Sequence, residues 1–238
     1  MFSQTANKYT FFTVFLLLLL VYLNSCNQGT ASNKMKEGEI EFEIEYLDNE
    51  RENPLISLLP RKMITAFKNN NSHSLIEGFF GTFKLVYISN YQKGKNVTLF
   101  QILDKKYMYH ADTSASPFGY QTDTDLKLVH TDKIKNIAGY ECENAMAIFP
   151  DLKDTIQLYF THELGIKNPN SNNPYKSIDG VLLAFSVKLL GINMKFRAKK
   201  IKAGKVDSEK FNIPDGYKKV SKSEMEKIMN EYNKVSDK

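Results

Sequence analysis

The residues of this chain best suited to covalent or metal chemistry are two cysteines and four histidines. The sequence has no His-Glu-x-x-His helix, no Cys-x-x-Cys pair, no Gly-x-Ser-x-Gly elbow and no phosphate-cradling Gly-rich loop. Cys142 lies in a strand-like stretch, where a single cysteine is typical of a small core residue. His162 and Glu163 are adjacent, and adjacent strand residues point to opposite faces of a sheet. We therefore expect no catalytic residues, no metal site, no cofactor and no enzymatic activity.

The other cysteine, Cys26, follows an apolar run typical of a signal peptide. Residues 11–23 are apolar apart from one threonine and follow Lys8. As a helix they would span about 20 Å, less than the roughly 30 Å hydrocarbon core of a membrane. The sequence Leu23-Asn24-Ser25-Cys26 resembles the lipobox of bacterial lipoproteins, in which the cysteine thiol accepts a diacylglyceryl group after cleavage. We predict a lipoprotein signal peptide over residues 1–25, recognised by the signal peptidase at Leu23, Asn24 and Ser25, and lipidation of Cys26.

This interpretation places the protein in the bacterial cell envelope, anchored to membrane lipid through acylated Cys26, in the outer membrane rather than the inner one. A plain secretory signal is the alternative. Removal of residues 1–25 takes only Lys8 from a total of 32 basic and 27 acidic residues. The remaining mild positive charge is far from the dense field that binds phosphate backbones, so we expect no nucleic-acid partner. The sequence does not identify a protein partner.

Most of the chain after Cys26 alternates between apolar and polar residues with the period of a β-strand. In residues 39–46 four apolar side chains alternate with four glutamates. The same period recurs in residues 81–88, 155–160 and 192–199, and turn signals separate these segments. We predict a flexible polar tether over residues 26–38 and a single β-rich domain over residues 39–238, with about eight to ten strands. The pattern alone suits an open sheet, a closed barrel or a sandwich.

Two short segments of this domain have helical signals, and one segment is a long polar loop. Residues 54–59 suit a short helix that Pro60 ends. Ser221 and Glu224 form a capping-box pattern before Met225, Ile228, Met229 and Tyr232, which would share one helical face. Residues 168–177 are polar with two prolines and are a candidate lid or rim.

Charged residues on two of the predicted strands match in spacing. The glutamates at positions 39, 41, 43 and 45 and the cations Lys195, Arg197 and Lys199 both repeat every second residue. Opposite charges across neighbouring strands stabilise a sheet, so we expect these two strands to lie close together on one outer face. A basic patch that touches anionic lipid head groups is the alternative interpretation of residues 195–205.

Residues 137–187 resemble uncharacterised bacterial lipoproteins that share a Gly-Tyr-x-Cys-x-x-Ala element, here residues 139–145. Tyr159-Phe160-Thr161-His162-Glu163 resembles their strand that ends in Thr-x-Glu, and Pro174 with the Ile-x-Gly at residues 178–180 resembles the stretch that opens their next strand. The chain lacks the Gly-Leu-Pro-Gly-Leu-Ile of the GLPGLI proteins and is placed beside that group. The resemblance implies the fold of LolA-like lipoprotein carriers: a strongly curved antiparallel sheet, an unclosed barrel with helices over its mouth and an apolar hollow inside.

Apolar side chains on the inferred strand faces would line such a hollow, although a filled core gives the same alternation. We therefore expect a membrane-anchored envelope lipoprotein that binds or carries a hydrophobic small molecule, such as a lipid or an acyl chain. The alternative is an interaction or structural module with a filled core and no ligand, which binds a partner protein through a strand edge or the polar loop. The expected ligand-lining residues are Phe42, Tyr46, Phe83, Tyr87, Leu158, Phe160, Phe185, Met194 and Phe196.

Overall fold

Hairpins that follow one another along the chain build the fold. The computed structural model describes residues 34–49, 54–90, 94–112, 118–120, 126–149, 155–171 and 173–234. The strands are β1 (Glu37–Tyr46), β2 (Lys62–Lys68), β3 (Asn71–Gly78), β4 (Phe83–Asn90), β5 (Lys95–Ile102), β6 (Lys105–Asp112), β7 (Lys127–Ile137), β8 (Tyr140–Ile148), β9 (Thr155–Thr161), β10 (Val181–Leu189), β11 (Ile192–Ala203) and β12 (Lys218–Lys219). The helices are α2 (Lys222–Lys234) and the short 3-10 helices η2 (Pro54–Leu58), η3 (Phe79–Gly81) and η4 (Ser208–Phe211).

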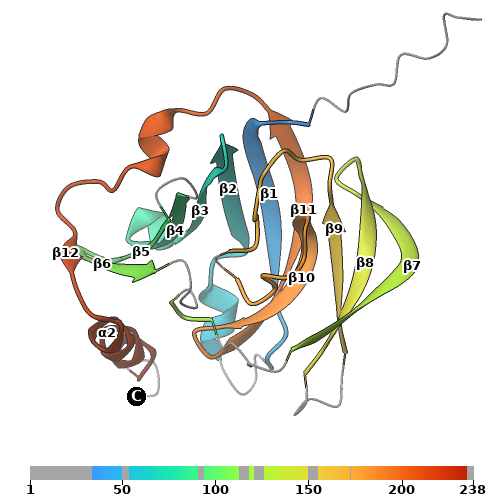
Figure 1. Cartoon of the computed structure of the whole chain (residues 1–238). Helices are drawn as coiled ribbons and strands as arrows, with labels where there is room; N and C mark the ends of the chain where they lie inside the picture. Colours follow the sequence, from blue (N-terminus) through green and yellow to red (C-terminus); the bar gives the residue numbers. More distant parts are fainter. Residues whose placement is uncertain are drawn as a thin grey trace, which may run out of the picture. The chain divides into compact units, whose positions relative to one another are not determined.

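All of these strands belong to one strongly curved sheet (Figure 1). The strand order is β12-β6-β5-β4-β3-β2-β1-β11-β10-β9-β8-β7, so two meanders meet where β1 pairs with β11. Every pair is antiparallel except the two-residue pairing of β12 with β6. Because β7 and β12 are edge strands and do not pair with each other, the sheet is an open one. The predicted mainly β fold, with an unclosed antiparallel sheet and a carboxyl-terminal helix, is confirmed.

The inner face of β1 and β11 follows the alternation in the sequence. Ile40, Phe42 and Ile44 are at most 3% exposed, and their partners on β11 include Phe196 and Ala198. The glutamates between them face outward and meet cations from neighbouring segments. Each of these four glutamates forms an ion pair with a lysine. The pairs are Glu39 with Lys210, Glu41 with Lys62, Glu43 with Lys199 and Glu45 with Lys195. The predicted proximity of the two charged strands is confirmed.

Strand β4 differs from its prediction in both extent and burial. It begins at Phe83 because Gly81 and Thr82 belong to the turn before it. Its outward side chains Val86 and Ile88 are also buried, in a second apolar cluster with Val97 and Leu99 of β5. The segment after β11 crosses this outer face and places Tyr217 against the cluster. Strands β4 and β5 are therefore covered on both faces, and neither is half-buried.

The two predicted helical segments are present. Residues 54–58 form η2, and Pro60 lies just beyond its end. In α2 the backbone N–H of Glu224 donates to Ser221 Oγ at 3.2 Å, and the Ser221 N–H donates to the Glu224 carboxylate at 3.1 Å, which is the predicted capping box. Met225 and Met229 are buried and Ile228 is partly buried against the main core, whereas the Tyr232 side chain lies outside the described residues.

The fold starts a few residues before the predicted end of the tether. Met35 forms a bridge with Leu164, and the Gly165 N–H donates to Met35 O at 2.8 Å. Residues 34–238 group as one compact unit. The signal peptide, Leu23, Asn24, Ser25 and Cys26 lie outside the described residues. Among the described helices none is both long and apolar enough to cross a membrane.

Candidate functional site

The side chains predicted to line a hollow are gathered on the inner face of the sheet, where they pack mainly against one another. Phe185 stacks on Phe196 with ring centroids 5.0 Å apart and meets Phe42 edge-on at 6.0 Å. Tyr46 and Phe83 are partly buried at the margin of the same cluster. Those buried in the cluster are Phe42, Tyr87, Leu158, Phe160, Phe185, Met194 and Phe196.

The long polar loop between β9 and β10 also fills this face. Tyr175 is 1% exposed, and its hydroxyl donates to Ser186 O on β10. Asn170 is buried as well, and its Nδ2 donates to the carbonyls of Ile178 and Gly180 at 2.8 and 2.9 Å. These bonds satisfy the buried amide and hold the loop closed. The loop predicted as a lid or rim is therefore a plug with Tyr175 at its centre.

Among the residues that the structure describes, the inner face borders a small cavity. The cavity under the loop has a volume of about 70 Å³. Sites for small molecules usually measure about 300–1,000 Å³, so this cavity is too small for an acyl chain. Of the nine expected lining residues, Phe42, Tyr87 and Phe185 border it. Phe118 is also buried nearby, and its carbonyl accepts a hydrogen bond from the Tyr87 hydroxyl at 2.9 Å.

Cys142 and two histidines occupy the β7–β8–β9 part of the sheet. The Cys142 side chain is fully buried, and burial raises the pKa of its thiol to about 11, which keeps it protonated at neutral pH. His130 and His162 each meet the Phe160 ring edge-on, at 5.8 and 5.6 Å between centroids. His162 Nε2 lies 3.5 Å from the Glu143 carboxylate. Within the described ranges, no group of three or more His, Cys, Asp or Glu side chains could hold a metal ion.

The most unusual exposed feature is a set of apolar side chains on two neighbouring hairpin turns. We call Phe79 and Phe80 of the β3–β4 turn and Leu103 of the β5–β6 turn the apolar tip. Phe80 is fully exposed, and Phe79 and Leu103 are 48% and 64% exposed. The Leu103 N–H donates to Thr82 O at 2.7 Å, which fixes the two turns side by side. Three large apolar side chains are thus presented to solvent together.

The backbone of the apolar tip is strained. Phe79, Phe80 and Leu103 have φ values of 51°, 55° and 54°, in the left-handed region that bulky residues avoid. Gly81 completes the turn at φ 84°, and Thr82 Oγ1 donates to Phe79 O at 2.7 Å. Each left-handed residue costs roughly 1–2 kcal/mol, and strain of this kind clusters at functional sites.

Aromatic packing connects the tip to the core. Phe79 meets Phe83 edge-on at 6.5 Å between ring centroids, and Phe83 meets buried Phe100 in the same manner at 5.9 Å. At the end of β3, a Cβ at Gly78 would lie 2.5 Å from Pro60 Cγ, so this position requires glycine for close packing. The apolar tip therefore stands on a packed base.

Sequence reasoning missed this tip because the alternation suggested that Gly81 and Phe83 share a strand. The signal that could have found it is the pair Phe79-Phe80 directly before Gly81, between two strands of similar length. Apolar side chains at such a turn lie beyond the ends of the strands, where the sheet cannot bury them fully.

The free edge of the sheet at β7 is poorly suited to strand addition. This strand carries exposed Lys127, Lys133 and Lys135, and its register with β8 shifts between Thr131 and Ile134. Lysines and bulges are the usual protection of an edge against pairing with another chain. Two elements were expected to bind a partner protein, a strand edge and the polar loop. The β7 edge is thus protected against strand addition, and the polar loop packs as a plug.

Comparisons with known proteins support the fold alone. No family model and no curated protein matches the chain. Two crystal forms of PNGF-II match it with TM-scores of 0.51 and 0.53 at 15% and 13% sequence identity. The matches cover 81% and 82% of this chain but only 32% and 33% of the PNGF-II chains, so the chain spans about a third of their length.

Proposed function

We propose that this protein is a lipid-anchored module of the bacterial envelope that binds a partner protein through its apolar tip and carries no ligand in its interior. The observation that carries the proposal is the fully exposed Phe80, held at φ 55° beside Phe79. An isolated exposed apolar residue is ordinary, but three together on turns with left-handed backbone are costly, which favours a binding role.

The position of Lys34, where the described fold begins, favours a protein over a bilayer as the binding partner of the apolar tip. Glu37 at the start of β1 pairs with Lys68 of β2, and β3 runs from beside this end to Gly78 at the other. The apolar tip therefore lies a strand length, about 26 Å, from Lys34. The eight residues from Cys26 to Lys34 reach at most about 28 Å, so an anchored domain could stand on its tip only with this segment almost fully extended. The tip fits a protein with a concave apolar pocket.

The inner face supports this choice over the carrier hypothesis. Its cavity of about 70 Å³ lies under a loop that buried Asn170 and Tyr175 hold in place. A carrier of acyl chains would need to expel Tyr175 before each binding event, at a cost of several kcal/mol for the lost burial and hydrogen bond.

Site-specific photocrosslinking in intact cells tests the proposed function. A photoreactive phenylalanine analogue replaces Phe80 in the full-length protein, and Ile134, an equally apolar and 56% exposed residue on β7, is the matched control position. We expect one protein adduct of defined mass from position 80 and none of that mass from position 134.

The same experiment includes a variant of the surrounding tip. Leu103→Asp should reduce the adduct from position 80 while the protein level stays unchanged, because the Leu103 side chain is 64% exposed and its loss leaves the core intact. Adducts with lipid alone, identical adducts from both positions, or no adduct would contradict a protein partner at the tip.

A further inference from the structure

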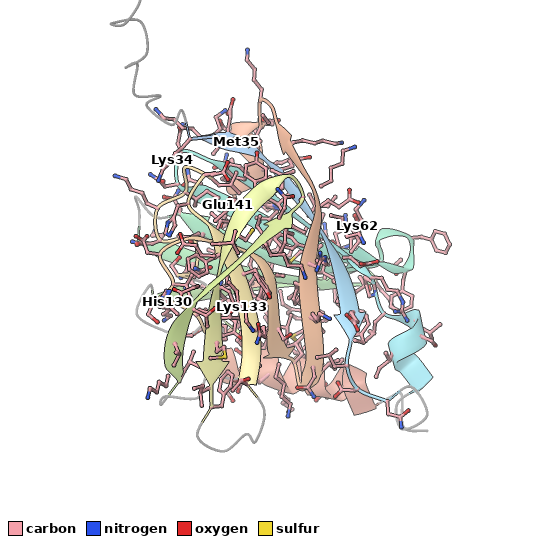
Figure 2. The ribbon with its side chains drawn as sticks, turned by 90° about the vertical axis from the view of Figure 1, so that its right-hand side faces the viewer. Lys34, Met35, Lys62, His130, Lys133 and Glu141 are labelled. Carbon is pink, nitrogen blue, oxygen red and sulfur yellow. The ribbon has the colours of Figure 1, made fainter. Side chains whose placement is uncertain are left out.

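Three lysines lie together where the folded unit begins. Lys34 and Lys36 precede β1, and Lys167 comes from the loop after β9. With His162 they border a cleft of about 400 Å³, which we call the basic cleft, and Asp179 is the only acidic residue among the described residues that line it. Figure 2 shows Lys34 and Met35 at the end of the sheet where the β7–β8 hairpin turns, above Glu141.

Close backbone contacts build this cleft. The Gly165 N–H donates to Met35 O, and a Cβ at Gly165 would lie 3.1 Å from that oxygen and 3.2 Å from Lys34 Cβ. The Lys167 N–H donates to Asn70 Oδ1 at 2.9 Å, which ties the loop to the β2–β3 turn. The three lysines are therefore carried on connected backbone segments and not on separate loose loops.

The cations of the basic cleft differ from the lysines that face the glutamates of β1. The lysines at positions 62, 195, 199 and 210 each have a glutamate of β1 within 3.1 Å. Among the residues that the structure describes, none of Lys34, Lys36 and Lys167 forms an ion pair. Ammonium groups without an acidic partner are available to bind phosphate oxygens. In the basic patch that is the alternative interpretation of residues 195–205, Lys195 and Lys199 are thus paired with glutamates of β1, whereas the three lysines of the basic cleft border one hollow.

We infer that the basic cleft binds the phosphate groups of anionic lipids at the membrane surface and so orients the anchored domain with its apolar tip outward. The inference rests on the proposed function, because lipidation of Cys26, eight residues before Lys34, would bring this end of the domain to the bilayer. Each lysine close to an anionic surface strengthens binding by roughly fivefold.

Vesicle binding by a chain without the acyl anchor tests the inference. The mature chain from residue 26 carries Cys26→Ser, and its flotation is measured with vesicles of pure phosphatidylcholine and of phosphatidylcholine mixed with phosphatidylglycerol. We expect binding only to the mixed vesicles and weakening as salt is raised, because the attraction is electrostatic. Replacing Lys34, Lys36 and Lys167 by glutamine should weaken it at least tenfold.

The matched control replaces three exposed lysines at the other end of the strands by glutamine: Lys105, Lys127 and Lys188. This variant has the same net charge and should bind within about twofold of the parent. Equal weakening by both variants, equal binding to both kinds of vesicle, or no binding would overturn the inference. Release of the protein from the mixed vesicles by inorganic phosphate, added at the same concentration as the lipid phosphate, would also overturn the inference and indicate a site for free phosphate. Photocrosslinking at Phe80 involves neither vesicles nor these lysines. Failure of the proposed function is therefore distinguishable from failure of this inference.

Discussion

Phe80 has a left-handed backbone and an exposed ring, so substitutions at this residue can test backbone strain and partner binding separately. Asparagine tolerates this backbone region better than phenylalanine or alanine. Phe80→Asn should therefore raise Tm by about 2–4 °C, whereas Phe80→Ala, which keeps the strain, should not. Thermal unfolding followed by circular dichroism measures both variants.

The two substitutions should have the same effect on partner binding because both remove the phenyl ring. With the photoreactive residue placed at Leu103, each should reduce the protein adduct. Stabilisation by Phe80→Asn together with an undiminished adduct would show that the strained phenylalanine has no part in binding.

His73 gives the fold a dependence on pH. Its side chain is half-buried on the outer face of β3, and burial is the main cause that lowers its pKa below the ordinary 6.5. Because the unfolded chain binds a proton more readily, the stability from neutral His73 is present above pH 6.5 and decreases as pH falls below it.

This pH dependence predicts a specific difference between variants. Tm should fall as pH decreases from about 7 to about 5.5, and His73→Gln should remove part of that decrease. His110→Gln should remove another part, since burial also lowers the pKa of His110. Parallel Tm profiles for the parent and His73→Gln would contradict the assignment.

At the scale of the elements, the pairing of β1 with β11 includes two cross-strand ion pairs. Lys195 Nζ lies 2.9 Å from Glu45 and Lys199 Nζ lies 3.1 Å from Glu43. Lys195→Glu with Lys199→Glu should lower Tm by about 2–6 °C at low salt, because each exposed pair contributes up to about 1 kcal/mol and like charges repel. Glu43→Lys with Glu45→Lys in the same chain should restore most of the loss. Failure of this restoration would mean that the loss arises from something other than charge pairing.

The plug formed by the β9–β10 loop predicts a large effect at Tyr175. Truncation to alanine leaves a void in the inner face and removes the hydrogen bond to the Ser186 carbonyl. Tyr175→Ala should destabilise the fold by about 3–5 kcal/mol and lower Tm by roughly 10 °C, whereas Ser177→Ala, at an exposed position of the same loop, should change it little. Similar melting of the two variants in differential scanning calorimetry would show that the loop does not pack as a plug.

The elements that could be predicted from sequence are those with one dominant local cause. The alternation in residues 39–46 and the Ser221–Glu224 capping box each specify their element without help from distant residues. The burial of Val86 and Ile88 could not be predicted in this way, because it depends on a segment more than a hundred residues later that crosses the sheet. Whether Tyr175 enters the interior is likewise decided by tertiary packing and not by the polar composition of its loop.

At the scale of the whole molecule, the folded unit has two chemically different ends. The basic cleft lies where the described fold begins, and the apolar tip lies a strand length away. Sequence reasoning found neither end because each is assembled from turns that the sheet brings together. Under the proposed lipidation of Cys26, this polarity suits one end for the membrane surface and the other for a partner.

Native mass spectrometry of the mature chain with Cys26→Ser, purified from envelope fractions without detergent, tests most directly whether the protein acts through its surface. We expect a mass equal to that of the polypeptide, because the cavity of about 70 Å³ on the inner face has no room for an acyl chain. A bound lipid or fatty acid in stoichiometric amount, retained in the Phe80→Asn variant, would contradict it and support a carrier.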